Sequence, residues 1–153
     1  GDAEACADLA AWPEDATAAE DALVGRLVAL RERDLPCAEE TPLAPLAAVP
    51  ALRCAARRHA LDLAERKTLA PEGRDGSTPQ ARAAEAGYVG RLRYELRAAD
   101  FRAASEVSDA LLEDDAYCAA LADPDVTDLG VGARRSDDGA FIAWVVLLGG
   151  PFE

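Results

Sequence analysis

The sequence of 153 residues contains no methionine, and aromatic residues make up only 5% of it. Because 50% of the residues are nonetheless hydrophobic, a core must be built mainly from alanine, leucine and valine. Small side chains of this kind favour closely packed helices. A chain of this length is long enough for one compact domain, so we expect a single domain over residues 1–153.

Basic residues are also scarce, with 16 Lys and Arg against 29 Asp and Glu, and the formal net charge is -13. An acidic surface repels phosphate backbones, so we expect no nucleic-acid partner. The arginines alternate with acids, as in residues 31–34, which predicts a solvated helix face. The longest apolar run, residues 140–148, is shorter than the roughly 20 residues that a membrane helix needs, so no transmembrane segment is predicted.

The sequence has no C-x-x-C pair, which argues against a zinc knuckle or a thioredoxin-type motif. Its four cysteines are widely spaced and favour two structural disulfides: Cys6, Cys37, Cys54 and Cys118. Disulfides imply an oxidising compartment, the cell exterior or the periplasm, with a signal peptide removed before Gly1. The alternative is a cytosolic protein with four free buried thiols, and the sequence alone allows three pairings.

The spacing of apolar residues, prolines and glycines predicts the secondary structure. Predicted helices cover residues 2–12, 17–34, 50–63, 79–86, 105–112 and 116–121, and the proline-rich residues 35–50 form an extended connection. Predicted strands cover residues 91–97, 126–133 and 140–148, with a turn at 136–139. Strict alternation places Leu92, Tyr94 and Leu96 on one side of the first strand. These elements predict an α+β sandwich with helices packed on the sheet.

Four segments carry a resemblance to a known family, in the same order and at similar spacings. Residues 52–64 are similar to the pattern L-x-x-A-A-x-x-H-A-x-D-M-A, and residues 75–88 to D-G-S-x-P followed by R-A-x-x-A-G-Y. Residues 94–98 fall on G-E-N-I-A, and residues 114–132 on S-P-G-H-x-x-x-L with its closing G-V-G. Over residues 50–149 the chain thus resembles bacterial CAP superfamily domains, the SCP-like group of cysteine-rich secretory, antigen 5 and pathogenesis-related 1 proteins. The resemblance implies a three-layer α-β-α sandwich around a small, mainly antiparallel sheet, with residues 1–36 as N-terminal helices.

CAP domains commonly hold a divalent metal between two histidines and one or two glutamates, donors that suit zinc-like ions. In the register above, the first histidine position is Pro71 and the second is Tyr117. Glu95 stands at the G-E-N glutamate, and Glu113 or Asp114 lies near a second acidic position. Two carboxylates alone make a weak, hard-cation site at best, so the resemblance implies a degenerate cleft with no metal and no cofactor.

No catalytic residue emerges from the sequence, which also lacks a G-x-S-x-G elbow. His59 is the only histidine and lies on the apolar side of a predicted helix. We expect it to be a buried structural residue bonded to the backbone, because a general base would need a partner that the sequence does not identify. Glu95 has two equal interpretations: a residual site residue, or a strand residue that pairs with neighbouring arginines.

The resemblance also suggests how the cysteines pair. Cys118 follows the second lost histidine position, where some bacterial relatives have a cysteine, so we expect Cys54 to pair with Cys118 and Cys6 with Cys37.

For function, the resemblance and the missing histidines imply a secreted, monomeric, non-catalytic module that binds a small apolar ligand or a protein partner. One alternative is an extracellular hydrolase or peptidase that uses His59, Glu95 and Tyr117. Another is a purely structural envelope protein.

Overall fold

The computed structural model describes residues 6, 9, 11–33, 35–39 and 42–152. Its helices are α2 (Glu14–Arg33), α3 (Pro50–Arg66), α4 (Pro79–Glu85), α5 (Ala104–Glu113) and α6 (Asp115–Leu121). Its strands are β1 (Ala47–Ala48), β2 (Arg91–Ala99), β3 (Asp128–Arg135) and β4 (Ile142–Gly150). The predicted elements after residue 13 are confirmed, whereas most of the helix predicted over residues 2–12 lies outside the described residues. The short strand β1, inside the proline-rich connection, was not predicted.

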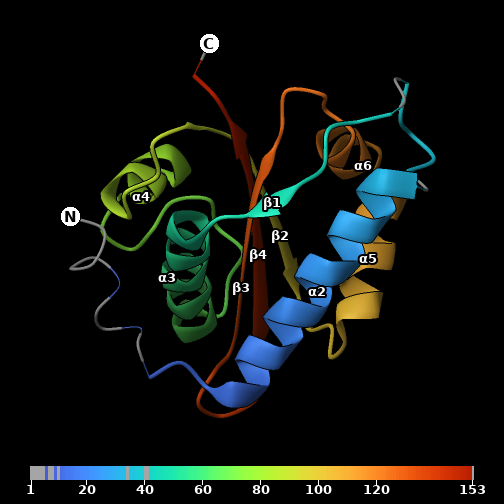
Figure 1. Cartoon of the computed structure of the whole chain (residues 1–153). Coiled ribbons are helices and arrows are strands. Elements are labelled where there is room, and N and C mark those ends of the chain that lie inside the picture. Colours follow the sequence, from blue (N-terminus) through green and yellow to red (C-terminus); the bar gives the residue numbers. More distant parts are fainter. Residues whose placement is uncertain (1–5, 7–8, 10, 34, 40–41, 153) are drawn as a thin grey trace.

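The strands form one sheet in the order β1-β3-β4-β2. β4 is antiparallel to both of its neighbours, and only the two-residue β1 runs parallel to β3. Helices α3 and α4 cover one face of the sheet, and α2, α5 and α6 cover the other (Figure 1). The predicted three-layer α-β-α sandwich with a mainly antiparallel sheet is therefore confirmed.

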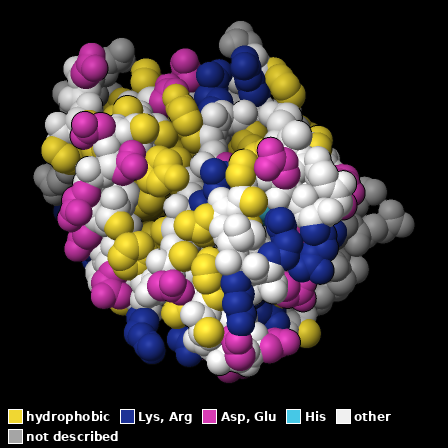
Figure 2. Space-filling model, turned by 180° about the vertical axis from the view of Figure 1, so that it is seen from behind, with side chains coloured by type: hydrophobic (Ala, Val, Ile, Leu, Met, Phe, Trp, Pro, Cys, Tyr) yellow, Lys and Arg dark blue, Asp and Glu magenta, His cyan; other side chains and the backbone are white. Residues whose placement is uncertain are grey.

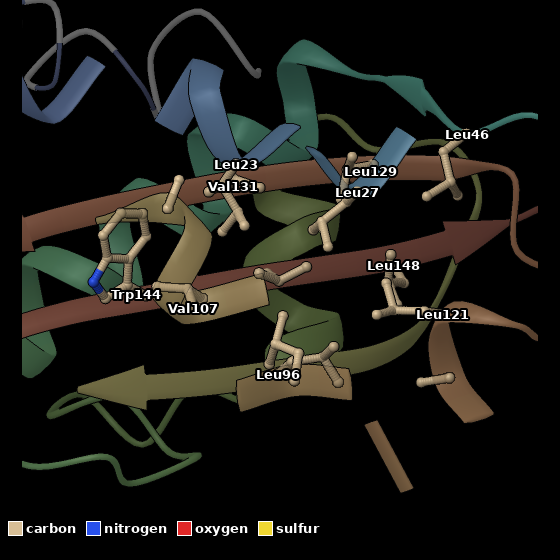
Figure 3. Close-up of a cluster of buried hydrophobic side chains, with 14 of the residues drawn as sticks. Leu23, Leu27, Leu46, Leu96, Val107, Leu121, Leu129, Val131, Trp144 and Leu148 are labelled. Atoms are coloured by element: carbon tan, nitrogen blue, oxygen red, sulfur yellow. The ribbon is translucent and has the colours of Figure 1, made fainter. Parts of the chain in front are cut away.

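The face covered by α2, α5 and α6 buries large aliphatic side chains, and we call this the leucine core. Leu23 and Leu27 of α2 lie over Leu129 and Val131 of β3, as Figure 3 shows. Because side chains alternate along a strand, every second residue of β4 joins them, and these are Trp144, Val146 and Leu148. Ten such residues are labelled in Figure 3, and they extend across the whole sheet.

The opposite face is packed mainly with small side chains, and we call it the alanine core. It contains the alternate β4 residues Ala143, Val145 and Leu147 together with the alanines of α3. Glycines in β3 let α3 lie directly on the strand: a Cβ at Gly132 would lie 2.6 Å from the Ala56 carbonyl oxygen. The shortage of large residues noted in the sequence is thus accommodated by close contact between helix and strand backbones.

One charged residue expected on a solvated face is buried. Arg31 is 3% exposed, and its guanidinium donates hydrogen bonds to four backbone carbonyls. These belong to Ala44, Leu121, Asp123 and Val126, at 2.8, 2.8, 2.8 and 2.5 Å. Burial lowers the pKa of Arg31, while Asp123 opposes that shift. The solvated face predicted at residues 31–34 is therefore wrong at Arg31, because its guanidinium is buried against the carbonyls of two loops and of α6.

Strand β2 contains a bulge that the alternation argument did not foresee. Its register against β4 shifts between Leu92 and Tyr94. Leu92 consequently packs against the alanine core, while Tyr94 and Leu96 belong to the leucine core. The predicted common face for these three residues is wrong at Leu92, since one extra residue in a strand reverses the sides that follow it.

All four cysteines form disulfides, but the predicted pairing is wrong. The structure joins Cys6 to Cys54 and Cys37 to Cys118, with Cα atoms 5.7 and 6.1 Å apart. Cys54 belongs to the alanine core and Cys118 lies on α6, on the other side of the sheet. The sheet separates these two residues, so each can bridge only within its own layer.

None of the described helices is long and apolar enough to cross a membrane.

Candidate functional site

Glu95, the acid that stands at the family's glutamate position, is buried between two arginines. It pairs in register with Leu147 of β4 and therefore faces α3 and α4. Its side chain is 3% exposed. One carboxylate oxygen, Oε2, lies 2.9 Å from Nη2 of Arg82, and the other, Oε1, lies 2.6 Å from Nη1 of Arg97. Both oxygens are thus held by charge-assisted hydrogen bonds.

Arg82 is placed by the turn at residues 75–79, the segment that is similar to the D-G-S-x-P pattern. Gly76 adopts a positive φ of 82°, and Thr78 caps α4 by accepting a hydrogen bond from the Ala81 backbone at 3.2 Å. One turn into the helix, the Arg82 side chain is 4% exposed and donates to the carbonyls of Ser77 at 2.9 Å and Pro71 at 3.0 Å. The same nitrogen that contacts Pro71 also contacts Glu95.

Sequence reasoning missed this role of Arg82, which it used only as part of a motif. The available signal was a single arginine among the alanines of a short helix, directly after a strong turn. An arginine at such a position is often buried by its neighbours, yet nothing in the sequence identifies its carboxylate partner.

His59 completes the cluster from α3 and is 1% exposed. Its Nε2 lies 2.9 Å from the Ala70 carbonyl oxygen and 3.7 Å from Oε1 of Glu95. Since a carbonyl only accepts hydrogen bonds, Nε2 carries the proton, and the buried Nδ1 has no hydrogen-bond partner among the described residues. Burial lowers the pKa of His59; Glu95 opposes this shift and Arg82 adds to it. The imidazole is therefore kept neutral near pH 7.

The residues of this cluster do not fit a metal ion. Both Glu95 oxygens already bind guanidinium groups, the Nε2 of His59 carries a proton, and Pro71 offers no side-chain donor. A cation would also meet the charges of Arg82 and Arg97. Within the described ranges, no group of three or more His, Cys, Asp or Glu side chains is arranged to hold a metal.

The other predicted cleft residues lie elsewhere. Tyr117 packs against the leucine core, on the far side of the sheet from Glu95. Asp114 caps α6, accepting a hydrogen bond from the Tyr117 backbone at 3.1 Å, and Glu113 is exposed at the end of α5. The structure thus brings Pro71 and Glu95 together around Arg82, and leaves these three residues in a different layer.

A pocket of about 340 Å³ opens beside the cluster and includes His59 and Arg82 in its lining. Its charged walls are already paired with each other. Asp62 lies 2.8 Å from Arg66 and 2.7 Å from Arg74. Burial alone would raise the pKa of Asp62, but hydrogen bonds from these two arginines outweigh it and lower the pKa to about 2. Most of the charged side chains in this pocket are therefore already paired with each other and are not free to bind a ligand.

A second pocket, of about 450 Å³, lies at the start of β3 and has mostly apolar walls, and we call it the Val89 pocket. Val89 is 88% exposed, the most exposed large hydrophobic residue described. Beside it, the Tyr88 hydroxyl donates a 2.6 Å hydrogen bond to Asp128, which fixes the ring. Val49 and Pro151 also line the pocket.

Comparisons with known proteins identify the fold and the family. An outer surface protein from Borrelia burgdorferi superposes with a TM-score of 0.72 at 23% identity, over 90% of this chain and 93% of that one. An extracellular protein containing an SCP domain from Bacillus anthracis gives 0.68 at 18%, over 88% of this chain and 43% of that one. A cysteine-rich secretory protein from Staphylococcus aureus gives 0.61 at 12%, over 88% and 39%.

Structural likeness at such low identity shows the fold alone, and no curated protein sequence gives a significant match. The sequence model of the cysteine-rich secretory protein family, CAP, however matches residues 26–148, which is most of the chain. The protein therefore belongs to the CAP family of cysteine-rich secretory proteins.

Proposed function

We propose that this protein is a secreted, non-catalytic CAP module that binds a small apolar ligand or a protein partner, with its family cleft closed by charge pairing. The observation that carries the proposal is the state of Glu95, which is 3% exposed and bonded through both oxygens to Arg82 and Arg97. Each oxygen of this carboxylate is held by a guanidinium group and shielded from solvent, so the carboxylate is not presented to a substrate or a metal.

Catalysis would need an accessible base or nucleophile within hydrogen-bond reach of a substrate. His59 is the only imidazole in the chain and is 1% exposed, with Nε2 bonded to the Ala70 carbonyl. Its partners hold it as a neutral structural group, which supports a binding role for the domain over a catalytic one.

The Val89 pocket supports the binding half of the proposal. Its volume of about 450 Å³ lies in the range of small-molecule sites, and its walls are largely apolar. Gly87, which also lines the pocket, has a positive φ of 93°, a backbone conformation that favours glycine. A valine that is 88% exposed gains by being covered, either by an apolar ligand or by a partner.

Secretion is supported by the two disulfides, because such bridges persist in oxidising compartments. The similar proteins named above include an outer surface protein and an extracellular protein, which agrees with the same location.

The closed cleft is tested by metal uptake and turnover. The protein is equilibrated with zinc, desalted and measured by elemental analysis, and peptide and ester substrates are assayed in parallel. We expect no stoichiometric zinc and no hydrolysis that changes in Glu95→Gln. Zinc bound at one equivalent in the wild type and lost in that variant would contradict the proposal.

The binding half is tested separately with the neutral apolar dye Nile red. We expect Val89→Asp to weaken binding by about tenfold or more, since it places a charge in the apolar wall. Leu69→Asp is the matched control, because Leu69 is also an exposed hydrophobic residue but lies outside the pocket. Equal binding by both variants and the wild type would remove the Val89 pocket from the proposal.

One observation favours the hydrolase alternative: His59 Nε2 and Glu95 Oε1 are only 3.7 Å apart. Opening of the cluster could turn this pair into a base with its orienting carboxylate. Hydrolytic activity that His59→Gln abolishes, with the fold intact by circular dichroism, would favour the alternative.

A further inference from the structure

A third pocket, of about 500 Å³, lies on the leucine-core side of the sheet at the end where α2 begins. Figure 1 shows the start of α2 beside the connection between β3 and β4, at the lower end of the molecule. The lining includes three arginines from two segments, Arg102, Arg134 and Arg135, and we call it the arginine pocket. It lies at the opposite end of β3 from the Val89 pocket.

Two of these arginines differ from those that are paired with acids. Several arginines of the chain are engaged by carboxylates, as Arg57 is by Glu20 at 2.6 Å. Arg102 and Arg135 are exposed, and within the described part of the chain neither guanidinium has an ion pair or a hydrogen bond. Figure 2 shows basic side chains at the lower margin of the molecule, the end where this pocket lies. A cation left unpaired by a protein of net charge -13 is available to an external anion.

The third arginine is fixed in place rather than free. The Arg134 guanidinium lies 4.8 Å from the centre of the Trp12 ring, which also contacts Arg57 at 5.1 Å. This cation–π contact anchors the end of β3 on which Arg135 also sits. Arg134 and Arg135 are therefore presented from the end of a strand, whereas Arg102 belongs to the connection between β2 and α5.

Part of the pocket floor is apolar, while polar groups make up most of the exposed lining. It includes Ala133, Ile142 and the buried Trp144, whose indole nitrogen already donates to the Phe101 carbonyl at 2.9 Å. The Ser136 hydroxyl is likewise engaged, with Asp138 at 2.7 Å. The cationic groups still free to orient a ligand are thus the guanidinium groups of Arg102 and Arg135, which line the same pocket as these apolar side chains.

The charge balance limits the ligand further. Asp15 and Asp137 also line the pocket, so three arginines face two aspartates and the net charge is +1. A polyphosphate would meet repulsion from both aspartates, whereas one carboxylate or sulfonate group can be held by a guanidinium fork. The volume of about 500 Å³ leaves room for an apolar body on the floor.

We propose that the arginine pocket binds a small organic monoanion, a carboxylate or sulfonate carried on an aromatic or aliphatic body. The anionic group lies between Arg102 and Arg135, and the apolar body rests on Ile142 and on the α2 residues Ala16 and Ala19. This site is independent of the proposed function, because it uses another face of the sheet and another ligand chemistry than the Val89 pocket.

The test is a fluorescence titration with the aromatic sulfonate 1-anilinonaphthalene-8-sulfonate. We expect Arg102→Gln/Arg135→Gln to raise the Kd at least about tenfold, as expected for the loss of charge-assisted hydrogen bonds. Arg33→Gln/Arg91→Gln is the matched control: it removes the same charge from two exposed arginines outside the pocket, and we expect the Kd to change less than about twofold. An equal increase of the Kd in both double variants would show that the effect depends on net charge alone, and would overturn the proposal.

Two further arms test the shape of the site. N-phenyl-1-naphthylamine has the same aromatic body without the sulfonate, and we expect its Kd to be at least about tenfold weaker. Ala16→Phe fills the pocket from α2 and is expected to abolish sulfonate binding, whereas Ala18→Phe, on an exposed position outside the lining, leaves it unchanged. Equal affinity for the neutral dye, or binding that survives Ala16→Phe, would contradict the assignment.

Discussion

Buried charged side chains have different kinds of partner on the two faces of the sheet. In the leucine core, Arg31 is satisfied by four backbone carbonyls and serves only to hold loops and helices together. In the alanine core, Glu95 is satisfied by the side chains of Arg82 and Arg97, at the position where the sequence resemblance places the family's cleft. The first arrangement depends on the main chain, whereas the second depends on side chains that single substitutions can remove.

The two faces of the sheet also differ in the size of the side chains that fill them. Leu23 and Leu27 fill space with large side chains, while Gly130 and Gly132 remove side chains so that α3 can approach β3. The leucine core should therefore be sensitive to lost volume and the alanine core to added volume. The charge cluster is closed by the same close approach, because α3 brings His59 against the ion pair.

The largest effect is expected from opening the charge cluster. Arg82→Met leaves the buried Glu95 without its fully buried partner, with only Arg97 still bonded to it, and should lower the free energy of unfolding by about 3–5 kcal/mol in urea denaturation. The double variant Arg82→Met/Glu95→Gln removes the stranded charge and should recover much of that loss. A cost below about 1 kcal/mol for the single variant would mean that the pair is not buried in solution.

A cavity in the leucine core comes next. Leu27→Ala removes a fully buried side chain from α2 and should cost about 3 kcal/mol, within the usual range for such cavities. Val89→Ala, at a position that is 88% exposed, is the control and should change stability by less than about 0.5 kcal/mol. Similar costs for both variants would argue against the packing described for this face.

Added volume in the alanine core should lower the free energy of unfolding by a somewhat smaller amount. A methyl group at Gly132 would lie 2.6 Å from the Ala56 carbonyl oxygen, so Gly132→Ala should destabilise by about 2 kcal/mol. Gly25, in the middle of α2, has nothing within 4 Å of the same position. Gly25→Ala should instead stabilise by about 0.5–1 kcal/mol, and the opposite signs are measured by thermal and urea unfolding.

The smallest effect concerns pH. Burial lowers the pKa of His59 below its ordinary value of about 6.5. When the pH falls below that value, the unfolded state therefore binds a proton at this residue before the folded state does. The free energy of unfolding should therefore decrease as the pH is lowered from about 7 to 5. His59→Gln should show a smaller decrease over the same range. An identical slope in the variant would show that the imidazole titrates freely.

Much of the fold could be predicted because its signals are local. Apolar spacing and prolines located α2, α3 and α4, and the Asp-Gly-Ser turn gave the cap of α4. The bulge in β2 was not predictable, since a single inserted residue leaves no mark in an alternating pattern. Arg31 was misjudged because its partners are backbone carbonyls, which have no signature in the sequence.

The candidate site could be predicted only in part. The resemblance located Glu95 and Pro71, which the structure brings together, but its other positions fall on the far face of the sheet. Arg82 was missed because its role is set by the contact between α4 and β2, which is made in three dimensions. The cysteine pairing failed for the same reason, since the side of the sheet decides which cysteines can meet.

The central claim, that charge pairing closes the family cleft, has a direct test in the single imidazole of this chain. A sample labelled with ¹⁵N at histidine gives one pair of ring signals, both belonging to His59. We predict a neutral ring protonated at Nε2, unchanged by one equivalent of zinc and still neutral at about pH 6.5. Ring nitrogen shifts that saturate at one equivalent of zinc, or a ring already charged at that pH, would contradict the account.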